Sequence, residues 1–115
     1  MQATYNILEA AKLVKSKNFF FASTSSIYGS NLKKKFKESD NSTKPIQLYA
    51  ATKSACEVIA HSYSINHKLN VMIFRFFTVY GPWGRPDMAL FKFVKNILNN
   101  KKIEVYNKGN HKRDF

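Results

Sequence analysis

The apolar positions of the chain predict helices and strands in alternation. Three segments carry apolar residues at helical spacing: residues 4–14, 48–67 and 88–99. Three short apolar runs predict strands: residues 19–22, 71–74 and 103–106. The first two runs are continuous enough to be buried on both faces of a sheet, and Asp87 stands where it can cap the last helix. Alternating helices and apolar strands predict an α/β fold, in which helices cover a parallel sheet.

Polar residues follow both of the first two strands. Ser23 to Ser26 come after the first strand, and Thr78 comes soon after the second. Ligands of open parallel sheets bind at the carboxyl ends of the strands, and a hydroxyl can donate and accept hydrogen bonds without adding charge. We therefore expect a ligand site at these turns. A serine-rich turn that binds nothing is the alternative at this point.

Tyr49 and Lys53 add candidate chemistry. Residues i and i+4 lie on one face of a helix, so both side chains can point into one cleft. A tyrosine is protonated at neutral pH, and an ammonium group, a nicotinamide cation and a helix N-terminus would each stabilise its anion. This spacing also arises by chance in a chain with six tyrosines and 16 lysines. An exposed Tyr–Lys pair without function is therefore the alternative.

The net charge raises the question of nucleic acid. The chain of 115 residues is 44% hydrophobic, which is typical of a globular protein, and its formal net charge is +12. Such a charge suits a nucleic-acid surface. The lysines are scattered, however, and their one cluster, residues 33–37, lacks interleaved aromatic platforms. Nucleic-acid binding is therefore disfavoured, although a basic binding module without catalysis stays open as a second class of function.

Other features of the sequence bear on location and on metals. The apolar runs are too short to cross a bilayer, and the first residues do not form a signal-peptide pattern. The single cysteine, Cys56, can form no internal disulfide, which fits a reducing compartment. The three histidines lack the spacing of metal ligands. We expect a cytoplasmic protein that binds neither a membrane nor a metal.

Taken together, the motifs resemble one family. They are the turn Ser23–Gly29, the segment Leu48–Lys53, the run Arg75–Phe93, and the segments Val105–Gly109 and Lys112–Phe115. They are similar to the extended short-chain dehydrogenase/reductases that act on nucleotide sugars, and most of all to UDP-glucuronate 4-epimerases. The resemblance implies that residues 1–80 are the C-terminal part of an NAD-binding domain with a doubly wound parallel Rossmann-type sheet, whose first strand–helix units are not in this chain. It also implies that residues 81–115 begin a smaller substrate-binding domain.

The resemblance implies NAD-dependent epimerisation of a UDP-hexuronic acid at C4 through a 4-keto intermediate. Tyr49 is then the base for the 4-hydroxyl of the sugar, and Lys53 binds the nicotinamide ribose and favours the ionised tyrosine. Thr24 hydrogen-bonds the reacting oxygen. Phe76 and Phe77 lie beside the nicotinamide, so that all five residues contact the cofactor or the reacting atoms.

The resemblance also assigns substrate contacts. Ser25, Ser26 and Thr78 contact the hexuronic acid, while Arg85 and Arg113 pair with the diphosphate, which suits the planar guanidinium group. Related dehydratases carry acidic residues where this chain has Ser25 and Ser26, so epimerisation is favoured over dehydration. The choice of glucuronate depends on Thr78 and the residues after it. A UDP-glucose/galactose 4-epimerase or another nucleotide-sugar enzyme is the alternative.

One motif of the family has no counterpart here. The glycine-rich turn that binds the pyrophosphate of NAD is not formed by any of the four glycines. We therefore expect the chain to be an internal part of a longer enzyme and to be inactive by itself. The resemblance implies that the full-length enzyme is a homodimer.

Overall fold

The computed structural model describes residues 1–29, 35–40 and 42–110. The chain forms two compact units, Met1–Phe77 and Thr78–Phe115, and each is described by itself. The expected division into functional domains at residue 80 stays a prediction.

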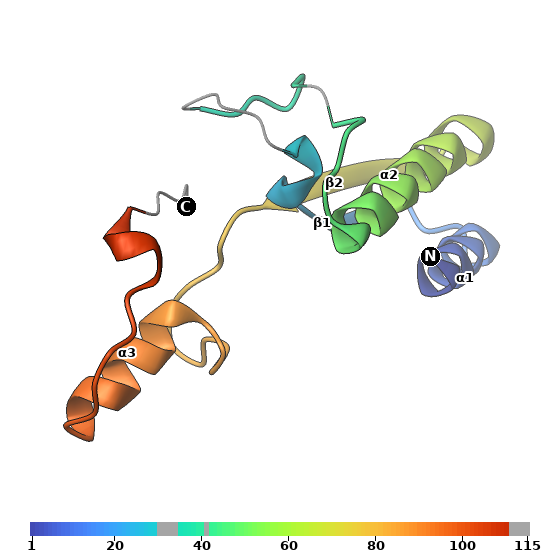
Figure 1. The fold of residues 1–115 in the computed structure, drawn as a ribbon. Helices are drawn as coiled ribbons and strands as arrows, with labels where there is room; N and C mark the ends of the chain where they lie inside the picture. The colour runs from blue at the N-terminus through green and yellow to red at the C-terminus, as the bar shows by residue number, and fades with distance from the viewer. Residues whose placement is uncertain (30–34, 41, 111–115) are drawn as a thin grey trace. The chain divides into compact units, whose positions relative to one another are not determined.

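The first unit is built around one strand–helix–strand motif (Figure 1). Its elements are α1 (Gln2–Leu13), β1 (Asn18–Thr24), the 3-10 helix η1 (Ser25–Tyr28), α2 (Leu48–His67) and β2 (Asn70–Phe76). The strands are parallel, and their register runs from Asn18 opposite Asn70 to Thr24 opposite Phe76. The predicted helices and strands of this unit, and the parallel α/β arrangement, are confirmed.

Local sequence explains the length and the end of α2. Alanine recurs along the helix, as expected for the residue with the highest helix propensity. The helix ends where Lys68 adopts a left-handed conformation with φ of 54°. Leu69 follows and is buried, and β2 begins at Asn70.

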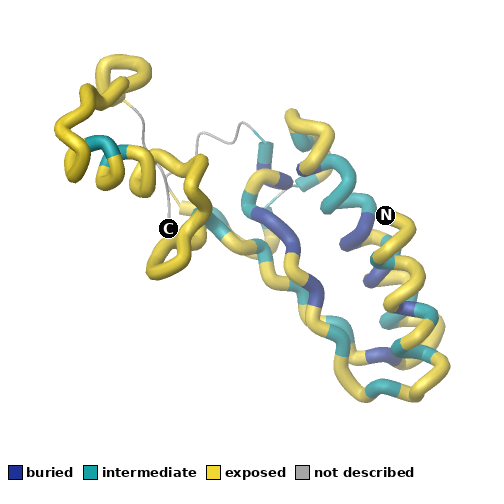
Figure 2. The backbone as a smooth tube through the Cα atoms, turned by 90° about the horizontal axis from the view of Figure 1, so that it is seen from below, coloured by how far each residue is buried: buried dark blue, intermediate teal, exposed yellow. Residues whose placement is uncertain are grey.

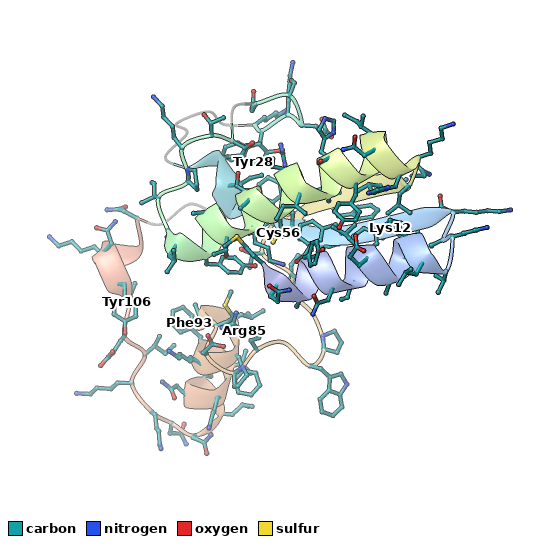
Figure 3. All side chains as sticks on the ribbon, turned by 90° about the vertical axis from the view of Figure 1, so that its right-hand side faces the viewer. Lys12, Tyr28, Cys56, Arg85, Phe93 and Tyr106 are labelled. Carbon is teal, nitrogen blue, oxygen red and sulfur yellow. The ribbon has the colours of Figure 1, made fainter. Side chains whose placement is uncertain are left out.

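The core lies between the two helices and the starts of the two strands. Leu8 of α1, Ala60 of α2 and Leu69 form one buried cluster, and Phe19 and Val71 pack against it. Ala50 of α2 and Ile27 of η1 are fully buried as well. Cys56, labelled in Figure 3, is also buried. Its Sγ accepts a hydrogen bond from the Thr4 hydroxyl at 3.4 Å. In Figure 2 the buried positions all lie in this first unit.

The opposite face of the strand pair is exposed in the described chain. Four large side chains alternate onto it: Phe20, Met72, Phe74 and Phe76. The prediction that both strands are buried on both faces is therefore wrong for the described chain, because α1 and α2 both pack against the other face. Phe74 stacks on Phe76 with ring centroids 5.9 Å apart, which leaves a continuous aromatic surface.

The second unit contains α3 (Ala89–Leu98) and the 3-10 helix η2 (Tyr106–Gly109). Met88, not Asp87, is the N-cap of α3, and no side chain caps the helix. Asp87 instead binds Arg85, so the predicted cap is wrong. The predicted strand at residues 103–106 is also wrong, because residues 101–105 have no regular structure and no described strand pairs with them.

The core predicts a test of α1 packing. Leu8 is 0% exposed, whereas Leu13 on the same helix is 76% exposed. Leu8→Ala should lower the free energy of unfolding by about 2 to 5 kcal/mol, because it leaves a cavity. Leu13→Ala should change it by less than about 0.5 kcal/mol. Urea denaturation followed by circular dichroism measures both, and equal losses would contradict the assigned core.

A polar contact also joins α1 to α2. The Tyr63 hydroxyl of α2 donates a hydrogen bond to Glu9 of α1, and Lys12 Nζ lies 2.9 Å from both carboxylate oxygens. The Tyr63 hydrogen bond and then the Lys12 ammonium hold the pKa of Glu9 below its usual value. The same hydrogen bond raises the pKa of Tyr63, because the Glu9 carboxylate disfavours the phenolate.

This contact should make stability depend on pH. Because the pKa of Glu9 is lower in the folded chain, its contribution exists above the ordinary value of 4.5 and is lost as the pH falls through the folded value. Glu9→Gln should therefore lower the urea midpoint at pH 7, and the difference from the wild type should close in acid. Glu38→Gln, at an exposed loop position, is the control. A Glu9→Gln deficit that stays constant into acid would contradict this origin.

Candidate active site

Thr24 lies at the carboxyl end of β1 and starts the turn that follows. Its Oγ1 accepts a hydrogen bond from the Ser26 backbone N–H at 3.2 Å and lies 3.2 Å from Ser26 Oγ. The turn closes at Gly29, whose φ is 66°. A Cβ at that position would lie 2.5 Å from the Lys44 carbonyl oxygen, so only glycine fits. The buried Thr24 hydroxyl is thus held at a fixed place.

Tyr49 and Lys53 lie on the first two turns of α2. Lys53 Nζ donates a hydrogen bond to the Ala22 carbonyl oxygen at 2.8 Å and lies 5.1 Å from the centroid of the Phe21 ring. The ammonium group therefore contacts β1 at Ala22, two residues before Thr24. Tyr49 is 55% exposed, and its hydroxyl has no hydrogen-bond partner among the described residues.

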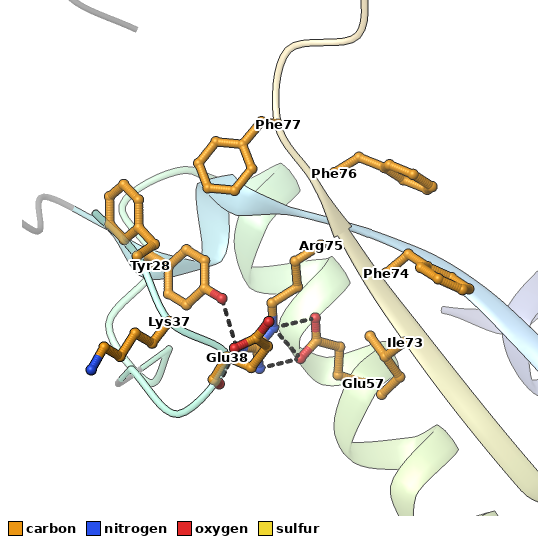
Figure 4. A pocket seen from close by; sticks show the side chains of 10 residues that line it. Tyr28, Lys37, Glu38, Glu57, Ile73, Phe74, Arg75, Phe76 and Phe77 are labelled. Atoms are coloured by element: carbon orange, nitrogen blue, oxygen red, sulfur yellow. Dashed lines mark hydrogen bonds and ion pairs between the residues drawn. The ribbon is translucent and has the colours of Figure 1, made fainter. Parts of the chain in front are cut away.

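A buried ion pair joins α2 to β2, as Figure 4 shows, and a hydrogen bond extends the contact to β1. Arg75 of β2 donates to Glu57 of α2 through Nε at 3.2 and 3.3 Å and through a terminal nitrogen at 2.8 Å. Ser23 of β1 donates its hydroxyl to the same carboxylate. The side chains of Glu57 and Arg75 are only 9% and 21% exposed. This Ser23–Glu57–Arg75 cluster lies one residue before Thr24 and Phe76.

Arg75 also fixes the segment after η1. Its second terminal nitrogen donates to the Tyr28 hydroxyl at 3.2 Å and to the Glu38 carbonyl oxygen at 2.9 Å. The guanidinium lies 5.1 Å from the centroid of the Tyr28 ring. The Glu57 hydrogen bonds raise the pKa of Arg75, which stays charged at any physiological pH. A cavity of about 440 Å³ lies beside this group, and Phe77 is in its lining.

The two phenylalanines at the end of β2 occupy different surroundings. Phe76 is opposite Thr24 in the strand register and belongs to the exposed aromatic face. Phe77 is half-buried, with its ring centroid 5.8 Å from that of Phe36. The structure therefore brings Thr24, Lys53 and Phe76 to the carboxyl end of the strand pair.

Of the remaining predicted substrate contacts, two lie next to Thr24, and the others belong to the second unit or lie outside the described residues. Ser25 and Ser26 lie in η1, directly after Thr24. Thr78 and Arg85 belong to the second unit. Arg85 is exposed and binds Asp87 at 2.6 Å, and this hydrogen bond lowers the pKa of Asp87. Arg113 lies outside the described residues.

Sequence reasoning missed the Ser23–Glu57–Arg75 cluster. Glu57 follows Tyr49 and Lys53 at a further interval of four, so helical spacing placed it on the same side of α2. Arg75 interrupts an apolar strand run. A charged side chain within such a run is rarely buried without a partner of opposite charge. Together, these two features of the sequence could have predicted that Glu57 and Arg75 form an ion pair.

The described residues form neither a metal-binding cluster nor a helix that could span a membrane. In the described ranges, no group of three His, Cys, Asp or Glu side chains could hold a metal ion. None of the described helices combines the length and apolar character that crossing a membrane requires.

Comparison with known proteins identifies the family. The chain matches the NAD dependent epimerase/dehydratase family over residues 1–115, and it belongs to that family. It is 54% identical over 112 residues to the probable UDP-glucuronate 4-epimerase of Rhizobium meliloti (strain 1021). That alignment covers 97% of this chain and 33% of the relative, so the chain spans about a third of the relative's length.

Solved structures give the same fold. The UDP-glucuronic acid 4-epimerase of Bacillus cereus, in complex with UDP-glucuronic acid and NAD, matches with a TM-score of 0.85 and 38% identity. The match covers 99% of this chain and 36% of that one. The UDP-N-acetylglucosamine 4-epimerase of Methanobrevibacter ruminantium M1, in complex with UDP-N-acetylmuramic acid, matches with a TM-score of 0.92 and 32% identity, over 100% and 38% of the chains. The Rossmann-type fold class is confirmed.

The residues at the carboxyl end of the strand pair fit the nicotinamide riboside part of NAD. Lys53 uses one of its three N–H groups on Ala22, which leaves two donors for ribose hydroxyls. Phe76 offers an exposed aromatic side chain beside Thr24 in the register. These groups suit a nicotinamide riboside. None of the four glycines forms the turn that holds the pyrophosphate of a dinucleotide.

The capping role of Thr24 leads to a test. Thr24→Val keeps the shape of the side chain but loses the oxygen that accepts from Ser26, so it should cost about 1 kcal/mol of unfolding free energy. Thr24→Ser keeps that oxygen and should cost less. Chemical denaturation measures both variants. If the valine variant were as stable as the serine variant, the hydroxyl would not hold the turn.

Proposed function

We propose that the full-length protein catalyses the NAD-dependent C4 epimerisation of a UDP-hexuronic acid, interconverting UDP-glucuronate and UDP-galacturonate through a 4-keto sugar. The observation that carries this proposal is the contact of Lys53 with Ala22, which sets an ammonium group beside Thr24 at the carboxyl end of β1. The similarity to UDP-glucuronate 4-epimerases, one of them solved with UDP-glucuronic acid and NAD, supports the substrate and the cofactor.

Three side chains carry the chemistry in this proposal. Tyr49, whose hydroxyl has no partner in the described chain, takes the proton from the 4-hydroxyl of the sugar. Lys53 stabilises the phenolate electrostatically and binds the nicotinamide ribose. The Thr24 hydroxyl turns from Ser26 to donate a hydrogen bond to the reacting oxygen.

The cofactor and its neighbours complete the site. When bound, NAD supplies the acceptor for hydride from C4 and its source in the return step. Phe76 and Phe77 flank the nicotinamide and help to exclude water from it. Ser25, Ser26 and Thr78 contact the hexuronic acid. Arg85 and Arg113 pair with the diphosphate, and Arg85 exchanges its exposed Asp87 partner for phosphate oxygens.

Epimerisation fits the turn better than dehydration does. Elimination of water needs an acid and a base near the sugar, and Ser25 and Ser26 supply neither. Glu57 is the carboxylate in contact with this end of the strands, and it is engaged by Ser23 and Arg75 at once. A carboxylate held in this way is a poor proton carrier.

Other substrates and a different class of function remain testable. The Methanobrevibacter structure comes from an enzyme named for a different sugar nucleotide, so assays should include UDP-glucose and UDP-N-acetylglucosamine. A basic binding module would instead show an affinity for nucleic acid that falls steeply with salt. The net charge of +12 is the observation that keeps this second candidate.

We further propose that the full-length protein is a homodimer in the cytoplasm. Helices α1 and α2 leave the large apolar side chains of Ile7, Val58 and Ile65 exposed, and a second copy could cover such side chains. The single free cysteine suits a reducing compartment. Analytical ultracentrifugation measures the oligomeric state.

The assignment of Tyr49 as the general base predicts the effect of removing its hydroxyl oxygen. Tyr49→Phe in the full-length protein should lower kcat for UDP-glucuronate about 10²- to 10⁴-fold, because the general base is lost. Its affinity for NAD and its unfolding midpoint should change little. Tyr5→Phe, which removes an exposed hydroxyl on α1, is the matched control. Near-normal turnover by Tyr49→Phe would show that another group takes the proton.

A further inference from the structure

Glu57 continues the stripe of α2 that carries the proposed chemistry. It lies four residues beyond Lys53 and eight beyond Tyr49, so one side of the helix presents all three side chains. Unlike Tyr49, Glu57 is buried. Both of its oxygens accept hydrogen bonds, one from Ser23 and Arg75 and the other from Arg75 alone.

The partners of Glu57 are Ser23 and Arg75, and each precedes a residue of the proposed site by one position in its strand. Ser23 and Arg75 are opposite each other in the strand register, and the next pair is Thr24 and Phe76. A shift of the carboxylate would therefore move the ends of both strands together. Side chains alternate along a strand, so Thr24 and Phe76 point away from Glu57 and can meet a ligand while their neighbours hold the helix.

The main apolar cluster lies away from the carboxyl ends of the strands, where Ala50 of α2 and Ile27 of η1 are fully buried. Its buried residues, Leu8, Ala60 and Leu69, lie toward the end of α2 and the starts of the strands. At the opposite end of the strands, the helix is joined to them by the Glu57 cluster and by the Lys53 contact with Ala22. Lys53 must itself bind the ligand under the proposed function, so it is a weak fixed support.

We propose that the Ser23–Glu57–Arg75 cluster is a positioning device for the reaction. It sets the distance between the Tyr49–Lys53 side of α2 and Thr24 at the end of β1. Glu57 and Arg75 touch neither substrate nor cofactor and act through the backbone that they fix. This inference rests on the proposed function for its kinetic part, whereas its structural part concerns the strand ends alone.

Glu57→Gln in the full-length protein tests the device. The amide keeps the size of the side chain and loses the charge that binds Arg75. We expect kcat to fall roughly 10- to 100-fold, since small displacements of reacting groups cost rates of this order. KM for UDP-glucuronate and Kd for NAD should change less than about threefold, because the binding groups remain. Hydrogen exchange of the amides of residues 22–26 should become faster.

Glu9→Gln is the matched control. Glu9 is likewise bound by a hydroxyl and a cation, but it joins α1 to α2 away from the strand ends. Its loss should lower stability and leave kcat within about twofold of the wild type. Ser23→Ala is a milder second variant that keeps the ion pair, and it should lower kcat by about threefold or more.

Three outcomes would overturn the inference. They are a kcat within twofold of the wild type in Glu57→Gln, unchanged exchange at residues 22–26, or an equal loss of kcat in Glu9→Gln. If the wild type itself does not convert UDP-glucuronate, the proposed function fails, and the exchange of residues 22–26 then decides the positioning role alone.

Discussion

The arrangement of the first unit depends on one buried carboxylate. Glu57 accepts hydrogen bonds from Ser23 of β1 and Arg75 of β2, and thereby joins α2 to both strands at their carboxyl ends. Desolvation makes a buried ion pair a doubtful source of stability, but its fork geometry tolerates little displacement. The helix is thus packed by apolar side chains at both ends, and near the carboxyl ends of the strands charge-assisted hydrogen bonds also fix it.

Much of this fold could be predicted from local patterns. Helix α2 has the same bounds as its predicted segment, because alanine content and apolar spacing indicate the same helix. The burial of both strand faces was predicted wrongly in the first unit, and the errors in caps and secondary structure lie in the second unit. Asp87 was a plausible cap by residue type, yet Arg85, two residues away, binds its carboxylate more directly. The run at residues 103–106 has strand-like composition, but composition cannot supply the neighbouring strand that pairing requires.

The site was only partly predictable for a related reason. Thr24, Tyr49 and Lys53 belong to short motifs, and the structure brings Thr24 and Lys53 to one end of the strand pair. Glu57 and Arg75 are 18 residues apart in the chain, and their contact exists only once the strand–helix–strand motif has formed. Pairing of this kind is a property of the tertiary structure. The second-unit residues Thr78 and Arg85 contact the substrate only in the proposal.

The central claim is that a base and a bound NAD interconvert two configurations at C4. Its most direct test is to incubate the full-length protein with NAD and UDP-glucuronate deuterated at C4, and to analyse the product by NMR and mass spectrometry. The expected product is UDP-galacturonate that keeps the deuterium at C4, because the hydrogen removed from that carbon returns to it without reaching solvent. Loss of the label to water, a dehydrated sugar, or no conversion would contradict it.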